Sequence, residues 1–147
     1  MRAVSNTASD LVTFSSRDVV VWRVIGSLLS GITAVGLIAF GAVGAAAPRP
    51  LGKAYGIEPA GAGATAYVRA LAARDIASGG ALLSALVARS RPALRGTILS
   101  LTVIALGDFT IVATLRGRAA AKNLAVHATG AGLMLAIWAI LGAETHG

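Results

Sequence analysis

Cysteine is missing from the chain, and charged residues are scarce. None of the 147 residues is a cysteine, which excludes disulfides, thiolate catalysis and sulfur-ligated metals together. Charged residues make up 13% of the sequence, about half the share of an ordinary soluble domain. Hydrophobic residues make up 56% and gather in long blocks. This composition argues against a soluble globular protein, and the length leaves no room for an α/β enzyme with a separate cofactor domain.

Acidic residues are the rarer of the two charge signs. Lys and Arg number 13 against 6 Asp and Glu, so the formal net charge is +7. In a water-soluble chain this excess would suggest nucleic acid as a partner. Here most basic residues flank the apolar blocks. This placement indicates membrane lipid with anionic headgroups, and not nucleic acid, as the counter-charge.

Four apolar blocks are long enough to cross a bilayer. Residues 24–47 carry no charge, and a spanning helix needs about 20 predominantly apolar residues. Further spans are expected at about 64–88, 96–115 and 123–142. The predicted fold is all-α, a transmembrane four-helix bundle. Its domain covers residues 24–142, between a polar tail at 1–23 and a short tail at 143–147.

Other interpretations of these blocks fit less well. The alanines at 45–47 resemble a signal-peptide cleavage site, but the apolar run is too long and follows 23 polar residues. Val and Ile cluster at 101–115 as in strands, yet membrane barrels require strict alternation, which is missing. Pro48 and Pro50 are expected to end the first helix, and residues 48–63 to form a turn-rich loop.

Small residues recur four positions apart in the spans, as in Ser27 with Gly31, Gly41 with Ala45, Gly80 with Ser84, and Ala128 with Gly132. Such pairs allow close helix packing in bilayers, although the abundance of Gly and Ala also explains any single pair. Basic residues favour a cytoplasmic N-terminus by six to five. We therefore expect an integral protein of the bacterial inner membrane with both termini in the cytoplasm.

Two of the six acidic residues, Asp75 and Asp108, lie inside apolar spans. Each costs on the order of 3 kcal/mol at mid-membrane, so it should face the bundle interior and have a partner. Counted from one membrane face, Arg69, Arg74 and His127 lie in the same half of the bilayer as these carboxylates. Adjacent side chains on a helix point apart, so Arg74 and Asp75 are expected to pair with other helices.

Helical phase directs these groups from three spans into one cavity with an apolar floor, which is the usual make-up of a small-molecule pocket. The candidate catalytic residues are Asp108, Asp75, His127 and Arg74, and the candidate substrate-binding residues are Arg69, Tyr67, Met134 and Trp138. Structural roles remain open for several of them. Arg74 and Asp108 could form an ion pair, His127 could bond a carbonyl, and Arg69 could reach the membrane surface. Tyr67 and Trp138 could belong to aromatic belts at the interfaces.

The motifs for cofactor chemistry are missing. A metal would need Asp75, Asp108 and His127 to converge, and no HxxxH, HxH or ExxH spacing supports this. The stretch GAGAT at 61–65 is typical of the start of a helix and not of a nucleotide fingerprint. We expect no metal and no cofactor, which leaves general acid–base chemistry by carboxylates and histidine.

Several of these positions occur together as a pattern: Gly56 and Pro59, then Tyr67-x-Arg69, Arg74-Asp75 and Gly79, then Gly107-Asp108 and His127. In this pattern the chain resembles a family of small four-helix membrane proteins of bacteria and fungi, catalogued as domain of unknown function 4267. The resemblance covers roughly residues 24–142. Because members resemble parts of biosynthetic neighbourhoods, it implies an enzyme acting on polyketide-like or terpenoid-like substrates.

Function classes remain open at this point. The first is a cofactor-independent intramembrane enzyme that isomerises, cyclises or hydrates a lipophilic small molecule. In it Asp108 or Asp75 is the acid or base, His127 relays the proton, and Arg74 with Arg69 holds a negative oxygen. The alternatives are a proton-coupled small transporter, acting as a homodimer, and an accessory or scaffold protein. Small exporters of that kind carry their key acid in the first span, where this chain has no charge.

Overall fold

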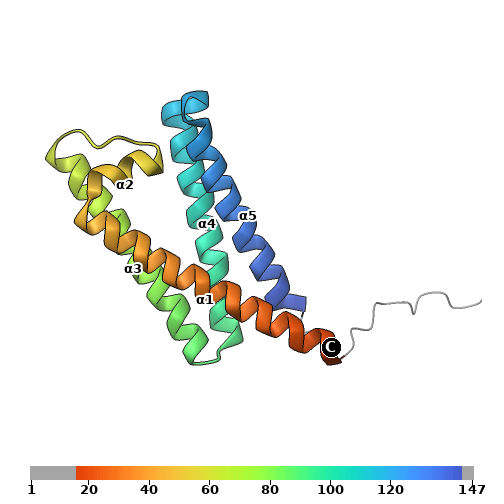
Figure 1. The fold of residues 1–147 in the computed structure, drawn as a ribbon. Helices are drawn as coiled ribbons and strands as arrows, with labels where there is room; N and C mark the ends of the chain where they lie inside the picture. The colour runs from red at the N-terminus through yellow and green to blue at the C-terminus, as the bar shows by residue number, and fades with distance from the viewer. Residues whose placement is uncertain (1–15, 144–147) are drawn as a thin grey trace, which may run out of the picture.

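The computed structural model describes residues 16–143, and between them it contains helices and no strand. The elements are α1 (Ser16–Ala46), α2 (Pro48–Tyr55), α3 (Gly61–Val87), α4 (Arg91–Arg116), the 3-10 turn η1 (Gly117–Ala120) and α5 (Ala121–Ala143) (Figure 1). The all-α prediction is confirmed. Most of the predicted polar tail and most of the short C-terminal tail lie outside the described residues.

Three helical stretches are long and apolar enough to cross a membrane, namely Val20–Ala46, Gly61–Val87 and Arg91–Gly142. The third contains α4, η1 and α5 in its 52 residues. It reverses direction at Gly117, whose φ of +52° lies in a region that favours glycine. Helix α5 then runs back along α4 (Figure 1). The third stretch is thus two antiparallel helices, and the predicted four-helix bundle is confirmed.

Helix α1 begins upstream of its expected start. Hydropathy placed that start at Val24, whereas the helix begins at Ser16 and includes the last part of the predicted polar tail. Hydropathy marks where the lipid-like sequence starts. A helix satisfies its backbone hydrogen bonds within the segment, so it continues beyond that point without further partners.

The expected loop at 48–63 contains the helix α2. Pro48 and Pro50 lie in its first turn, where a missing N–H costs nothing and the fixed φ suits a helix. Gly56 ends the helix with φ of +106°, and its N–H donates to the carbonyl oxygen of Gly52 at 3.1 Å. The prolines that end the first helix therefore begin the second.

The four long helices form two antiparallel pairs, α1 with α3 and α4 with α5 (Figure 1). Glycines allow the first pair to approach closely. A Cβ on Gly41 would lie 2.5 Å from the carbonyl oxygen of Ala72, and one on Gly79 would lie 2.6 Å from that of Ala34. Gly41 belongs to the small-residue pairs noted in the sequence. A Cβ on Gly80 or Gly132, which also belong to them, would meet no atom of another helix within 4 Å.

The main core joins both pairs toward the α3–α4 turn. It contains nine buried residues from the four long helices: Ala34, Leu82, Ala85, Leu94, Ile98, Leu101, Met134, Ile137 and Leu141. A second cluster of Leu51, Val68 and Ala72 fixes α2 on α3. The two pairs diverge toward the end that carries α2 (Figure 1). The packed core thus occupies one half of the bundle and leaves the other half for a cavity.

Candidate functional site

A cavity of about 220 Å³ lies at the α2 end and receives side chains from all five α-helices. Five of the residues singled out in the sequence line it: Arg74, Asp75, Asp108, His127 and Met134. The remaining lining is largely aliphatic and aromatic, and includes Leu37 and Phe40 of α1. The structure therefore brings α3, α4 and α5 together as helical phase predicted, and adds α1 and α2 to the wall.

The guanidinium of Arg74 connects two carboxylates. Its Nη1 donates to Asp108 Oδ1 at 3.1 Å and its Nη2 donates to Asp108 Oδ2 at 3.0 Å. This is the two-pronged geometry in which Arg binds carboxylates most strongly. The Nε and Nη2 atoms also donate to Asp75 Oδ1, at 3.2 and 3.0 Å. One cation thus serves an acid on its own helix and an acid on α4.

The contact between Arg74 and Asp75 corrects an expectation. Pairing with another helix does occur, through Asp108, but the expectation that the neighbours Arg74 and Asp75 would not pair is wrong. Their Cβ atoms diverge by about 100° around the helix. The arginine side chain is long enough to turn back, so its Nε edge meets Asp75 while its outer edge meets Asp108.

The cluster is well shielded and its charges do not balance. The Asp75 and Asp108 side chains are 12% and 11% exposed, and that of Arg74 is 30% exposed. Two carboxylates face one guanidinium, so the cluster has a charge of −1 when both acids are ionised and is neutral when it holds one proton. One proton is therefore enough to neutralise the cluster.

Tyr55 belongs to this site, although the sequence analysis did not select it. It is the last residue of α2 and lines the cavity. Burial raises the pKa of the Tyr55 phenol above its usual range, and the neighbouring Asp108 carboxylate raises it further. The available signal was the spacing of Leu51 and Tyr55, which puts both on one face of a short helix. The prolines before them favoured a loop instead.

Two side chains of α5 hold the end of α2 in place. Asn123 Nδ2 donates to the carbonyl oxygens of Ala54 and Lys53, at 2.7 and 3.3 Å. His127 Nε2 lies 3.1 Å from the carbonyl oxygen of Tyr55. A carbonyl only accepts, so Nε2 carries a proton in this contact. The carbonyls of Ala54 and Tyr55 at the helix end thereby gain partners, and that of Lys53 also accepts from the Gly56 N–H at 3.1 Å. His127 thus has the carbonyl bond that the sequence analysis weighed against a role as proton relay.

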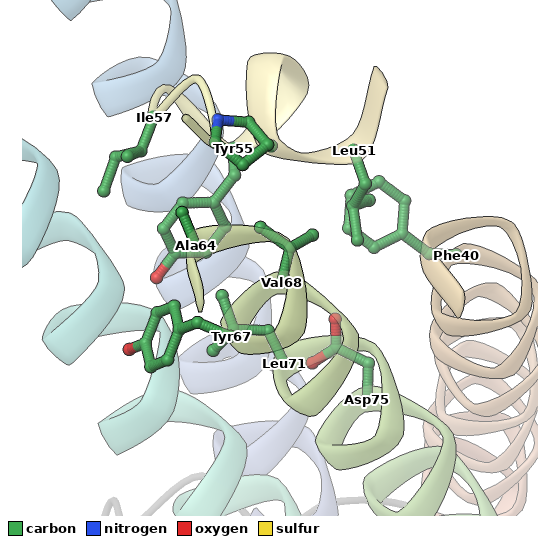
Figure 2. A pocket seen from close by; sticks show the side chains of 11 residues that line it. Phe40, Leu51, Tyr55, Ile57, Ala64, Tyr67, Val68, Leu71 and Asp75 are labelled. Carbon is green, nitrogen blue, oxygen red and sulfur yellow. The ribbon is translucent and has the colours of Figure 1, made fainter. Parts of the chain in front are cut away.

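Tyr67 lines a neighbouring cavity of about 60 Å³ (Figure 2). This smaller cavity shares Phe40, Tyr55 and Asp75 with the larger one. In Figure 2 the Asp75 carboxylate lies on α3, at the edge of the apolar side chains that line this cavity. Tyr67 itself is 58% exposed. Asp75 therefore borders both cavities.

Two predicted substrate-binding residues lie elsewhere. Arg69 is exposed on α3 and lines neither cavity. Trp138 packs against the main core, and the guanidinium of Arg95 lies 4.8 Å from its ring centroid. It shares a helix face with His127 but follows it by three turns, about 16 Å along the axis. Helical phase therefore predicted the face of α5 on which Trp138 lies. Its distance from His127 along the helix, however, places Trp138 at the opposite end of the bundle.

A metal site is not formed by the residues described. Between residues 16 and 143, His, Asp and Glu nowhere gather in a group of three that could hold an ion. The arrangement can position a proton and a negative oxygen, through two carboxylates, a guanidinium and a phenol.

These features define a class: a small helical membrane protein with an ion cluster beside a cavity within its spans. The chain belongs to the family described as domain of unknown function (DUF4267), whose model matches residues 34–141. The resemblance seen in the sequence is confirmed, and the matched range contains the whole charged cluster. No curated protein and no solved structure matches the chain.

Proposed function

We propose that the protein is an intramembrane enzyme that uses no cofactor and performs acid–base chemistry on a lipophilic small molecule. The observation that carries this proposal is the position of Arg74, Asp75 and Asp108 on the wall of a largely apolar cavity. Charged groups in a membrane span are costly, and they are kept mainly for function. Shielded acids with neighbouring cations are the groups that enzymes use to move protons.

The two carboxylates have different surroundings and therefore different roles. Asp108 is held at both oxygens by Arg74 and also interacts with Tyr55. Both Arg74 contacts to Asp75 reach Oδ1, which leaves Oδ2 for a ligand. We assign the transferred proton to Asp75. Asp108 orients Arg74, and the N–H of Arg74 Nη1 that no carboxylate accepts stabilises negative charge on a substrate oxygen.

The cavity size indicates how a substrate would bind. Its volume of about 220 Å³ lies below the ~300–1,000 Å³ of pockets that enclose a whole drug-sized ligand. The cavity would thus hold the reacting end of a longer molecule, such as a terpenoid-like or polyketide-like chain. Phe40 and Met134 would contact its hydrocarbon part. Asp75 gives a proton to the substrate and takes one back from it or from water, so isomerisation, cyclisation or hydration needs no other reactant.

Deuterium transfer tests this proposal and does not require the substrate to be identified first. The full chain, in nanodiscs of one synthetic phospholipid, is incubated in D₂O with the apolar lipid extract of its expression host. Mass spectrometry then seeks a species that gains carbon-bound deuterium. We expect such a species with the wild type, and a loss of at least about 100-fold in its rate with Asp75→Asn, because positioned acid–base groups contribute factors of this order.

The matched control is Glu58→Gln, which removes an exposed carboxylate that pairs with Lys53 at 3.1 Å outside the spans. It should leave the deuterium transfer unchanged. The enzyme proposal fails if the wild type transfers no more deuterium than empty nanodiscs. The assignment of Asp75 fails if Asp75→Asn transfers as fast as Glu58→Gln.

A further inference from the structure

A third cavity, lined by basic residues, lies at the other end of the bundle. It has a volume of about 480 Å³ and forms where the first turns of α1 meet the α3–α4 turn. Its polar lining consists of Arg23, Ser27, Arg89, Ser90 and Arg91. The rest of its wall is aliphatic, and none of the described residues in the lining is acidic. The cavity is thus positively charged and distinct from the cavity beside α2.

We infer that this cavity binds a phosphate group, and that the group belongs to the headgroup of an anionic phospholipid. Three guanidinium groups around one hollow repel one another, and an anion between them relieves this repulsion. Guanidinium groups match the oxygens of a phosphate in pairs. The two serines add hydroxyl donors.

The position in the membrane favours a lipid over a dissolved anion. The candidate spans begin at Val20, end at Val87 and begin again at Arg91. The three arginines therefore lie at the ends of spans, where phospholipid phosphates are found, and basic pockets between spans are a known means of holding anionic headgroups. The aliphatic wall offers a surface for the first part of the acyl chains.

The backbone supports a specific role for Arg89. Its φ of +51° is the one positive value at a non-glycine residue among those described. Ser90 N–H donates to Ala85 O and Arg89 N–H to Leu86 O, both at 3.0 Å. This is the helix ending in which glycine is the usual residue. An arginine there accepts backbone strain, and its guanidinium contributes to the cavity.

Arg23 and Arg91 each make a further interaction within the chain. The inference does not require them to be unpaired, because a guanidinium has five N–H donors. Ser90 precedes α4 and makes no side-chain cap of that helix. The positive end of the α4 dipole therefore adds to the arginine charges.

The test compares phospholipids that differ in headgroup charge. The full chain in neutral detergent is mixed with dioleoylphosphatidylglycerol or dioleoylphosphatidylcholine, and native mass spectrometry measures the bound lipid. We expect the phosphatidylglycerol to bind more tightly. The variant Arg89→Gly with Arg91→Gln should weaken its binding at least about tenfold, because it removes two charge-assisted contacts. Arg89→Gly also relieves the positive φ, so this variant keeps its fold, as circular dichroism will verify.

The matched control is Arg116→Gln with Arg118→Gln at the opposite end of the bundle. There Arg116 lines a separate small cavity whose lining also includes the acidic residue Glu58. An equal loss of phosphatidylglycerol in this control would show that total charge decides binding, and would overturn the inference. A third arm uses inorganic phosphate, followed by ³¹P NMR line broadening. Phosphate binding that depends on Arg89 and Arg91, without phosphatidylglycerol binding, would support a phosphate site with a soluble ligand. The inference is also overturned if neither probe distinguishes the cavity variant from the wild type.

Discussion

Arg74 is the residue on which the electrostatics of the α2 end depend. Among the described residues it is the only cation in the lining of the 220 Å³ cavity beside α2, and its two edges contact different carboxylates. Replacing Asp108 by a neutral residue weakens its paired hydrogen bonds with Arg74 and leaves Arg74 with Asp75 alone. The arrangement is therefore sensitive to single neutral substitutions.

Asp108→Asn tests this sensitivity. The variant keeps the shape of the side chain but leaves Arg74 with Asp75 alone. We expect a loss of about 3 kcal/mol in the free energy of unfolding, because two hydrogen bonds to a charged group are weakened and each is worth roughly 1.5–3 kcal/mol. Denaturation of the detergent-solubilised chain by SDS measures it. A loss no larger than that of the exposed Glu58→Gln would contradict the role given to the pair.

Tyr55 links the same cluster to pH. Its folded pKa lies above the unfolded value of about 10, because of burial and the neighbouring Asp108 carboxylate. Its contribution to stability is therefore fully present below about pH 10 and declines as the pH rises further. The difference in unfolding free energy between the wild type and Tyr55→Phe should be constant below pH 10 and shrink above it. A difference that is flat or grows above pH 10 would show that the phenol is not shielded in solution.

Sequence reasoning found the charged residues of the site for a simple physical reason. Arg74, Asp75 and Asp108 stand out because charge is expensive in an apolar span. Tyr55 and Asn123 carry no charge and lie at or beyond the ends of the expected spans, where polar residues are common. Their roles depend on where α2 lies relative to α4 and α5, which no pattern within one segment reveals.

Close approach of α1 and α3 is the main feature at the scale of helices. It depends on glycines that face a backbone, as Gly41 and Gly79 do. The length of the apolar blocks predicted the four long helices, because each helix continues through such a block. It missed α2, which has only 8 residues and is held by contacts with α3 and α5. It also suggested Gly80 as a packing glycine, whereas its neighbour Gly79 makes the contact.

The neighbouring glycines 79 and 80 form a matched pair for experiment. A Cβ on Gly79 would lie 2.6 Å from the carbonyl oxygen of Ala34, whereas one on Gly80 meets nothing within 4 Å. Gly79→Ala should destabilise the fold by about 1–3 kcal/mol through overpacking. Gly80→Ala should be neutral or stabilise it by up to about 1 kcal/mol through helix propensity. SDS denaturation of the two variants compares them directly, and equal effects would contradict the close packing of α1 on α3.

The path of the chain through the membrane is the main property at the scale of the molecule. Helices α4 and α5 lie within one long apolar stretch, and the turn at Gly117 makes them antiparallel. The α3–α4 turn and the η1 turn therefore lie at opposite ends of the bundle (Figure 1). The weak excess of basic residues on one side does not determine which end faces the cytoplasm by itself.

The absence of cysteine makes this path easy to measure. Ala88 and Ala119 are exposed near the two turns, so Ala88→Cys and Ala119→Cys each introduce the only thiol of the chain. We expect a membrane-impermeant maleimide to label them from opposite sides of a sealed vesicle. With the N-terminus in the cytoplasm, Ala88→Cys is labelled from the cytoplasmic side. Labelling of both from the same side would contradict the two crossings by α4 and α5.

Close packing between the two helix pairs is concentrated at one end of the bundle. The nine residues of the main core lie toward the α3–α4 turn, while the cavity beside α2 lies where the helix pairs diverge. Any widening of the cavity thus pivots about the packed end and takes place within one leaflet of the bilayer. The lateral pressure of that leaflet, which depends on the shapes of its lipids, would then affect how far the cavity opens.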